Sequence, residues 1–208
     1  MVEKRVEKTL SKREKLHRKL VYARTMYAVK YFLLTIVLSF IGWLYEVILM
    51  KVKYGTWEDR GFLHAPICPI YGCTLLFIYF LLGTPKEKKG ICNNIKNPLL
   101  HNALYLAFAF LIPTIAELFV GLFFDKNFQI TLWSYSSVPM NYRGYISLPI
   151  SLVWSMMIYL FMRWLFPLFK MLIFHIPDVI ALTLSTVLFV VLLMDVSISF
   201  LQIAGGQV

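Results

Sequence analysis

Three carboxylic acids stand inside long apolar runs of this 208-residue sequence, namely Glu46, Glu117 and Asp195. An ionised side chain is costly in lipid, so it normally faces protein or water and has a partner. Two arginines, Arg60 and Arg143, follow the first two acids along the chain and can supply such partners. Acids and arginines in this arrangement can form structural ion pairs, bind a polar solute or ion, or transfer protons. The sequence leaves these roles open, and the first two are compatible with each other.

Each arginine begins a copy of one short motif. Residues 60–67 read RGFLHAPI and residues 143–150 read RGYISLPI. Each copy follows an apolar run that contains one glutamate, and its proline opens the next apolar run. We interpret this pattern as an internal duplication of a two-helix unit. The spacing from glutamate to arginine is 14 residues in the first copy and 26 in the second, which indicates an insertion in the second loop.

His64 lies four residues after Arg60 and is the one residue near the acids that suggests acid–base chemistry. An enzyme acting on lipid would use it together with Glu46. Its counterpart in the second copy is Ser147, which argues against a shared catalytic role. No HExxH, GxSxG or Walker A motif occurs, so the chain supplies no ATP-binding chemistry of its own. The cysteines lack the spacing of a disulfide framework or a zinc site, and we expect neither a metal nor a cofactor.

The composition indicates a chain that lies in lipid. It is 59% hydrophobic and 15% charged, which is too apolar for a soluble domain of this length. We predict an all-α, polytopic membrane helix bundle in which spans 1–2 and 3–4 form the duplicated unit in parallel orientation and a fifth span follows. The membrane domain covers residues 31–208, and its predicted spans are residues 31–52, 66–83, 99–124, 146–168 and 176–204.

The charge distribution predicts how the chain is oriented. The net charge is +10, and 10 of the 21 Lys and Arg residues lie in residues 1–30. This tail is either a solvated basic segment or an amphipathic surface helix, and its expected partner is the anionic cytoplasmic leaflet rather than nucleic acid. With the tail inside, the cytoplasmic segments hold 16 Lys and Arg and the outer segments hold 5. The positive-inside rule then places the N-terminus in the cytoplasm and the C-terminus outside the cell membrane.

With this orientation the acids and both arginine motifs lie toward the outer side of the membrane. We therefore expect one outward-facing charged cluster, in which Glu46 and Glu117 pair with the two arginines in either combination. Its members are Glu46, Arg60, His64, Glu117, Arg143 and Asp195.

Two blocks of residues carry a resemblance to a known family. The first block is Gly42-Trp43-x-x-Glu46 with Arg60-Gly61-Phe62-Leu63-x-x-Pro66-x-x-Pro69-Ile70-Tyr71-Gly72. The second is Glu117, Trp133-x-Tyr135-Ser136, Asn141-x-x-Gly144-x-Ile146-x-Leu148 and Trp154. Over roughly residues 31–166, the chain resembles small bacterial membrane proteins catalogued as putative ABC-transporter type IV permeases. It departs from their pattern at Ser134, where an acid is usual, and at Tyr145, where an arginine is usual.

The resemblance implies a permease-like membrane subunit that binds a small solute or a lipid headgroup at the outward cluster. A separate ATP-binding subunit would energise it, and a homo-oligomer is compatible with this function. The alternatives are a non-transporting membrane sensor or assembly factor and, less favoured, an intramembrane lipid-modifying enzyme. The residues that support the site through the motifs are Trp43, Gly61, Pro66, Tyr71, Asn141, Gly144 and Trp154.

Overall fold

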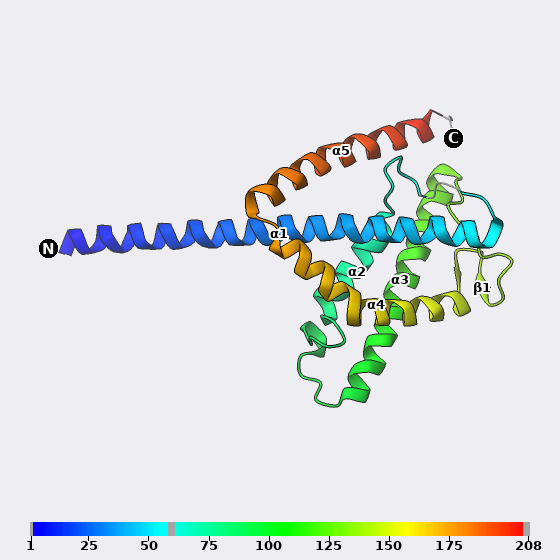
Figure 1. Cartoon of the computed structure of the whole chain (residues 1–208), viewed down its shortest axis with the longest axis horizontal. Helices are drawn as coiled ribbons and strands as arrows, with labels where there is room; N and C mark the ends of the chain where they lie inside the picture. The colour runs from blue at the N-terminus through cyan, green and yellow to red at the C-terminus, as the bar shows by residue number, and fades with distance from the viewer. Residues whose placement is uncertain (1, 58–60, 206–208) are drawn as a thin grey trace.

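The computed structural model describes residues 2–57 and 61–205, and this part of the chain is mostly helical (Figure 1). Its helices are α1 (Val2–Tyr54), α2 (Pro69–Leu82), α3 (Pro98–Phe128), α4 (Leu148–His175) and α5 (Asp178–Ala204). A short 3-10 helix η1 (Gly90–Cys92) lies between α2 and α3, and strands β1 (Asn141–Tyr142) and β2 (Ile146–Ser147) pair in antiparallel register before α4. The predicted all-α membrane bundle is confirmed.

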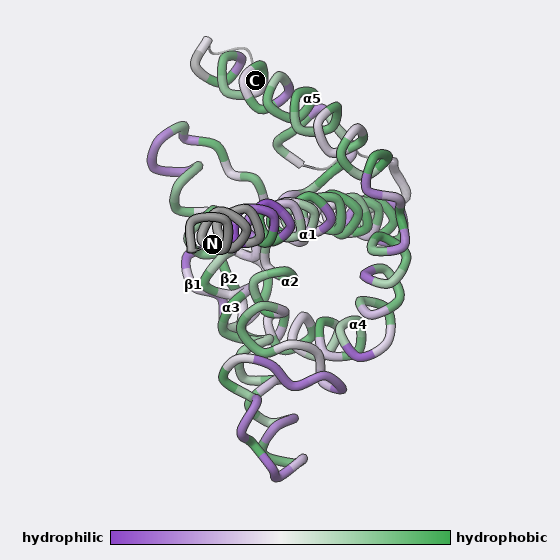
Figure 2. The backbone as a smooth tube through the Cα atoms, turned by 90° about the vertical axis from the view of Figure 1, so that its left-hand side faces the viewer, coloured by the Kyte–Doolittle hydropathy of each residue, from purple (hydrophilic) through white to green (hydrophobic). Residues whose placement is uncertain are grey.

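Four of these helices, α1, α3, α4 and α5, are long and apolar enough to cross a membrane. In the most apolar 18-residue stretches of α3 and α5, only 11% of the residues are buried inside the protein, so the remaining apolar surface of these helices requires lipid. Figure 2 shows hydrophobic residues along most of the helical path, with hydrophilic ones mainly in the N-terminal part of α1 and in connections. The apolar helix α2 has 14 residues and is about 21 Å long, which is shorter than the hydrocarbon layer of about 30 Å.

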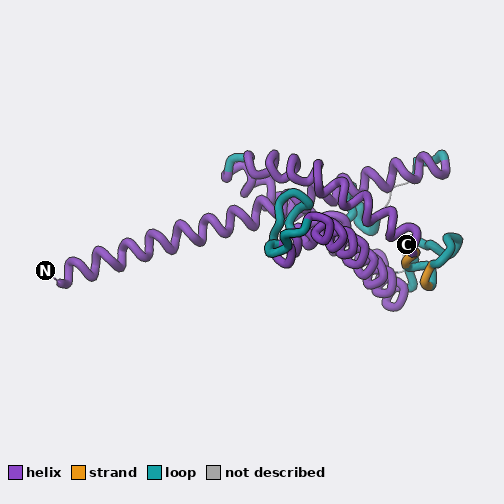
Figure 3. The backbone as a smooth tube through the Cα atoms, turned by 90° about the horizontal axis from the view of Figure 1, so that it is seen from below, coloured by secondary structure: helices purple, strands orange, loops and turns teal. Residues whose placement is uncertain are grey.

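Helix α1 joins the basic tail and the first predicted span in one continuous helix. Its sequence contains no proline and only one glycine, Gly42, so no local signal stops the helix at residue 30. It ends before Gly55, whose φ of 77° is left-handed and typical of a helix C-terminus. The N-terminal part of α1 projects away from the other helices (Figure 3), and residues 13–25 are exposed there.

Two glycines allow α1 and α2 to pack closely. A Cβ atom on Gly72 would clash with the carbonyl oxygen of Thr35 and with the hydroxyl of Ser39. A Cβ atom on Gly42 would clash with the ring of Tyr71. Small residues at such crossings let helix backbones approach each other within a membrane. The crossing therefore brings Tyr71 directly against α1.

Helices α3 and α4 also meet at a close contact, in which the Ser155 hydroxyl donates a hydrogen bond to the Leu106 carbonyl at 2.9 Å. Helix α4 continues through Pro167 to His175, beyond the expected end of the fourth span. A turn at Pro177 then leads into α5. Lys30 fastens this turn to α1 through an ion pair with Asp178, at 2.7 Å between Nζ and Oδ1.

Candidate functional site

One side chain from each of α1 to α4 and one from the connection before α4 meet in a group that we call the acid–aromatic cluster. Its members are Glu46, Tyr71, Glu117, Tyr135 and Trp154. The Tyr71 hydroxyl donates a hydrogen bond to Glu46, and the Tyr135 hydroxyl donates one to Glu117 at 3.4 Å. The Trp154 ring lies with its centroid 5.4 Å from that of Tyr71. Two carboxylates that are 71 residues apart in sequence are thus linked through aromatic side chains.

The charges of Glu46 and Glu117 both act on the hydroxyl of Tyr135. Burial raises the pKa of the Tyr135 hydroxyl, and the negative charges of Glu117 and Glu46 raise it further, while a hydrogen bond with Trp154 acts in the opposite direction. Tyr71 likewise interacts electrostatically with Glu46, Tyr135 and Glu117. A tyrosine is protonated near neutral pH even at its ordinary pKa of 10, and the raised pKa extends this further, so the Tyr135 hydroxyl is a hydrogen-bond donor to Glu117.

Helical geometry explains how the first motif block positions its acid. Gly42 and Glu46 are four residues apart and lie one above the other on the same face of α1. The space left by Gly42 accommodates the Tyr71 ring, whose hydroxyl then reaches Glu46 one turn further along. Trp43, the neighbour of Gly42, stacks on Phe40 with a centroid distance of 5.9 Å.

The connection between α3 and α4 is folded by Asn141 and presents Tyr135. The Asn141 side-chain amide donates to the carbonyl oxygens of Ser136 and Val138 at 3.3 and 2.7 Å, and its oxygen accepts from the N–H of Gly144 at 3.1 Å. The N–H of Tyr135 in turn donates to the Gly144 carbonyl at 2.8 Å. Asn141 and Gly144 therefore support the cluster by shaping the backbone that carries Tyr135.

Of the two arginines predicted to pair with Glu46 and Glu117, the structure describes Arg143. Arg143 is exposed, and its guanidinium lies 5.8 Å from the ring centroid of Tyr142. Its φ of 51° lies in the left-handed region because it forms the hairpin turn with Gly144, whose φ is 76°. Arg60 lies outside the described residues. The pairings of Glu46 and Glu117 with the two arginines stay predictions.

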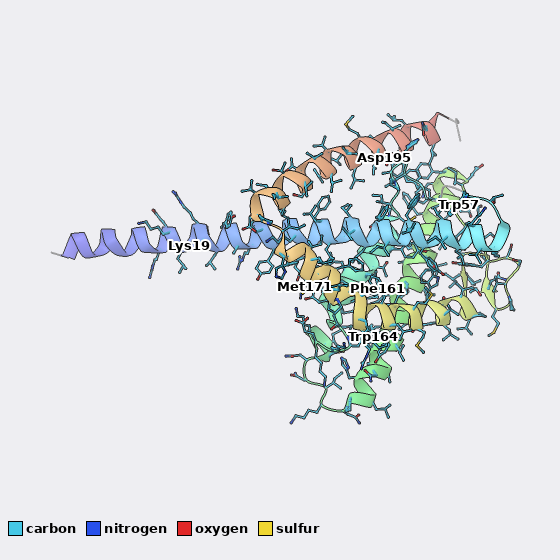
Figure 4. The ribbon with its side chains drawn as sticks, viewed as in Figure 1. Lys19, Trp57, Phe161, Trp164, Met171 and Asp195 are labelled. Atoms are coloured by element: carbon cyan, nitrogen blue, oxygen red, sulfur yellow. The ribbon has the colours of Figure 1, made fainter. Side chains whose placement is uncertain are left out.

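His64 and Asp195 form a second group, between the first arginine-glycine loop and α5. The His64 Nδ1 atom lies 2.9 Å from Asp195 Oδ1, and the backbone N–H groups of His64 and Ala65 donate to the same carboxylate at 3.1 and 2.9 Å. Figure 4 shows Asp195 on α5. Ser199 Oγ also approaches His64 Nδ1, at 3.2 Å. In a catalytic triad serine and aspartate bind opposite nitrogens of the histidine, so this geometry is that of an anchor and not of a nucleophile relay.

The loop that Asp195 anchors is the one that contains Gly61 and Pro66. Gly61 has a φ of 124°, which favours glycine, and the side chain of neighbouring Leu63 is buried. Pro66 is exposed and precedes α2 by three residues. The structure therefore brings Glu46 and Glu117 together and joins His64 to Asp195, in two separate sets of contacts.

Four residues that the sequence reasoning did not single out form a lysine–tyrosine cluster. Lys89 Nζ and Lys170 Nζ both donate to the Tyr79 hydroxyl oxygen, at 2.7 and 2.5 Å. The Glu87 carboxylate lies 3.1 Å from the first ammonium group and 3.7 Å from the second. The sequence feature that could have indicated this cluster is the high density of lysines around a single glutamate in residues 84–98, which follow Tyr79 near the end of an apolar run.

The described part of the chain contains no group of three or more His, Cys, Asp or Glu side chains that could hold a metal ion. The three cysteines, all among the described residues, form no disulfide, and Cys68 and Cys92 are buried whereas Cys73 is exposed. The absence of a cofactor stays an expectation from the sequence.

A comparison with protein families finds one match over most of the chain. The model of the family described as putative ABC-transporter type IV matches residues 32–200. This range includes both clusters and Asp195, and it extends the resemblance noted for residues 31–166 into α5. No curated protein and no solved structure gives a match.

Proposed function

The chain belongs to the putative ABC-transporter type IV family, and we propose that it acts as the permease-like membrane subunit of a transport system. Its apolar helices suit a membrane-embedded subunit. Because the sequence has no Walker A motif, a separate ATP-binding protein has to supply the energy. The proposed binding site for a small solute or a lipid headgroup is the acid–aromatic cluster.

The observation that carries this proposal is the meeting of Glu46 and Glu117, from different helices, with Tyr71, Tyr135 and Trp154. Carboxylates accept hydrogen bonds, and the faces of aromatic rings attract cations. The cluster therefore favours a solute with an ammonium group or another strong hydrogen-bond donor. An amine-bearing lipid headgroup meets the same requirement. The positive-inside distribution supports an outward-facing position for the cluster.

The binding proposal is tested with the purified protein in detergent and a panel of small amines, amino alcohols and amine-bearing headgroups. A ligand should raise the melting temperature, and Glu117→Gln should abolish this shift while the protein remains folded. Glu14→Gln, which removes an exposed acid on the projecting part of α1, is the matched control. A ligand-induced shift that survives Glu117→Gln and Glu46→Gln unchanged would contradict the assignment of the site.

The proposal of an energising partner is tested by affinity purification from native membranes. An ATP-binding protein should co-purify, and its ATPase activity should respond to the ligand found in the thermal assay. The projecting basic part of α1 is the feature that favours the alternative of an assembly factor or sensor, because it presents a long exposed surface. Recovery of a partner without ATPase activity, with no ligand effect, would favour that alternative. The lipid-modifying enzyme has less support, since His64 contacts Asp195 and Ser199.

A further inference from the structure

We propose that the lysine–tyrosine cluster of Tyr79, Glu87, Lys89 and Lys170 is a binding site for the phosphate group of an anionic ligand. This site is distinct from the acid–aromatic cluster and does not depend on the function proposed for it. Lys170 follows Trp154 by 16 residues on α4, which corresponds to about 24 Å along a helix. The two clusters thus lie toward opposite ends of the bundle.

The cluster has more hydrogen-bond donors than its phenol oxygen can accept. A phenol oxygen has two lone pairs and carries one proton of its own. Lys89 and Lys170 both donate to the oxygen of Tyr79, and Tyr31 is a third hydrogen-bonding partner of the same side chain. Each ammonium group has three N–H donors. A group with several acceptor oxygens, such as a phosphate, would satisfy the donors that the phenol cannot.

The cluster also holds two positive charges and one negative charge. Both ammonium groups lie over the same Tyr79 ring, at 4.7 and 4.8 Å from its centroid, so they are close neighbours and repel each other. Glu87 is the carboxylate that contacts them, and its side chain is half-exposed. A phosphate group would bring the additional negative charge that two adjacent lysines favour, through charge-assisted hydrogen bonds.

The backbone holds the groups of this cluster in place without a ligand. Gly83 and Gly90 have φ values of 82° and 48°, and a Cβ atom on either would clash with backbone carbonyl oxygens. The N–H of Glu87 donates to the Thr84 hydroxyl at 2.9 Å, and the N–H of Lys89 donates to the Leu82 carbonyl at 3.0 Å. The site is therefore preorganised, which lowers the entropic cost of binding.

The position of the cluster fits a ligand at the membrane surface. Tyr79, Glu87 and Lys89 lie where α2 ends and the lysine-rich connection to α3 begins, and Lys170 reaches them from α4. The Lys89 and Lys170 side chains are 40% and 25% exposed. An anionic phospholipid presents a phosphate at this depth, and a free phosphate ion can reach it from water. Both ligands share the chemistry that the cluster recognises, and the experiment separates them.

The test uses the full-length protein in nanodiscs of neutral phosphatidylcholine. Short-chain phosphatidylglycerol, short-chain phosphatidylcholine and inorganic phosphate are titrated separately, and the melting temperature is recorded. We expect phosphatidylglycerol to stabilise the protein and phosphatidylcholine to have no effect. In the variant Lys89→Gln/Lys170→Gln, the apparent affinity should fall by about tenfold or more, because two charge-assisted donors are lost. Lys96→Gln, an exposed lysine in the same connection, is the control and should stay within about twofold.

The outcomes decide the proposal and the source of the phosphate. Stabilisation by inorganic phosphate as well would identify a free-anion site, and stabilisation by phosphatidylglycerol alone would identify a lipid headgroup site. The proposal is overturned if neither ligand stabilises the protein, or if Lys96→Gln weakens binding as much as the double variant. If the double variant does not fold, Glu87→Gln decides: removal of the competing carboxylate should tighten binding by about threefold, and an unchanged or weaker affinity overturns the proposal.

Discussion

Glu46 and Glu117 each accept a hydrogen bond from a tyrosine hydroxyl, and Asp195 accepts two from backbone N–H groups. Such donors satisfy part of the hydrogen-bonding capacity of a carboxylate at membrane depth. The predicted partners of Glu46 and Glu117 are arginines of opposite charge, and those pairings stay predictions. In the sequence Tyr71 and Tyr135 stand out only as parts of motifs, since hydrogen bonding between distant helices depends on packing that the sequence does not display.

The contact between Tyr135 and Glu117 predicts a measurable coupling. Tyr135→Phe removes the phenol donor of a carboxylate that is partly buried, and the free energy of unfolding should fall by about 1–3 kcal/mol. Glu117→Gln should also lower it, and the double variant should lose less than the sum because both changes remove one interaction. Thermal and chemical denaturation in detergent measure the four proteins of this cycle. Tyr142→Phe, at an exposed position of the same connection, is the control, and strictly additive losses would count against the contact.

The lysine–tyrosine cluster predicts how stability depends on pH in acid. Partial burial tends to raise the pKa of Glu87, but the hydrogen bond from Lys89 and the charges of Lys170 and Lys89 lower it below its usual value of 4.5. A carboxylate with a lowered folded-state pKa stabilises the protein above the unfolded pKa, and this contribution is lost as pH falls through the lowered value. Because Glu87 is half-exposed, the contribution is below about 1 kcal/mol.

Glu87→Gln should therefore lower the melting temperature slightly at pH 7 and flatten its decline below pH 4.5, the usual pKa of this group. Melting curves between neutral and acid pH, recorded for wild type, Glu87→Gln and the control Glu14→Gln, measure this difference. If the melting temperature falls with pH in the same way for all three proteins, the two lysines do not stabilise the ionised form of Glu87.

Among the elements, the long apolar helices were the part that hydropathy could predict. The third span was expected at residues 99–124, and α3 covers Pro98–Phe128. The ends were less predictable. Helix α4 continues through Pro167, although proline tends to end a helix. Met162 and Phe166, which precede it on the same helix, are buried in the core, so tertiary packing outweighs the local effect of the proline. Helix α2 begins only at Pro69 because the backbone before it is hydrogen-bonded to α1. The N–H of Cys68 donates to the Ser39 carbonyl oxygen at 3.0 Å.

The two helix pairs share a contact at matching positions of the proposed duplication. Counted from the glutamates, Thr35 of α1 corresponds to Leu106 of α3, and counted from the motif prolines, Gly72 of α2 corresponds to Ser155 of α4. Gly72 abuts the Thr35 carbonyl, and Ser155 donates to the Leu106 carbonyl. Equivalent small residues thus meet equivalent backbone positions, which is the relation that a duplicated two-helix unit predicts.

The close crossing of α1 and α2 predicts the effect of adding one methyl group. Gly72→Ala places a Cβ atom against the Thr35 carbonyl and the Ser39 hydroxyl, so the helices must separate, at a cost of about 1–3 kcal/mol. Since Tyr71 is the neighbouring residue, ligand-induced stabilisation at the acid–aromatic cluster should weaken too. Cys73→Ala, at an exposed position one residue further, should change stability by less than about 0.5 kcal/mol. Equal melting temperatures for both variants would mean that the crossing tolerates a larger residue.

Across the whole molecule, the polar groups gather toward two ends of an apolar bundle. Toward one end Glu46 and Glu117 join their tyrosines, and toward the other Lys89 and Lys170 join Tyr79. The distribution of Lys and Arg predicts that the lysine-rich segments and the acids lie on opposite sides of the membrane, and this orientation stays a prediction. The sequence did not predict that Glu46 and Glu117 would lie in one set of contacts and His64 and Asp195 in another, since that depends on where α5 lies beside the first loop.

The orientation of the bundle leads to the final prediction, which is made with single cysteines in a cysteine-free protein. Residue 90 is unsuitable for the inner connection because Gly90 has a φ of 48° and no room for a Cβ atom, so Lys96→Cys is used. Trp57→Cys and Lys126→Cys, at exposed positions, report the loops after α1 and α3. With the N-terminus inside, a membrane-impermeant maleimide added outside intact cells should label residues 57 and 126 and leave residue 96 unlabelled until the cells are opened.

This result requires α2 to connect the two sides although it has only 14 residues, with the residues that flank it completing the crossing. Labelling of residues 57 and 96 from the same side would instead mean that α2 enters and leaves by one face, and the parallel orientation of the two units would have to be abandoned.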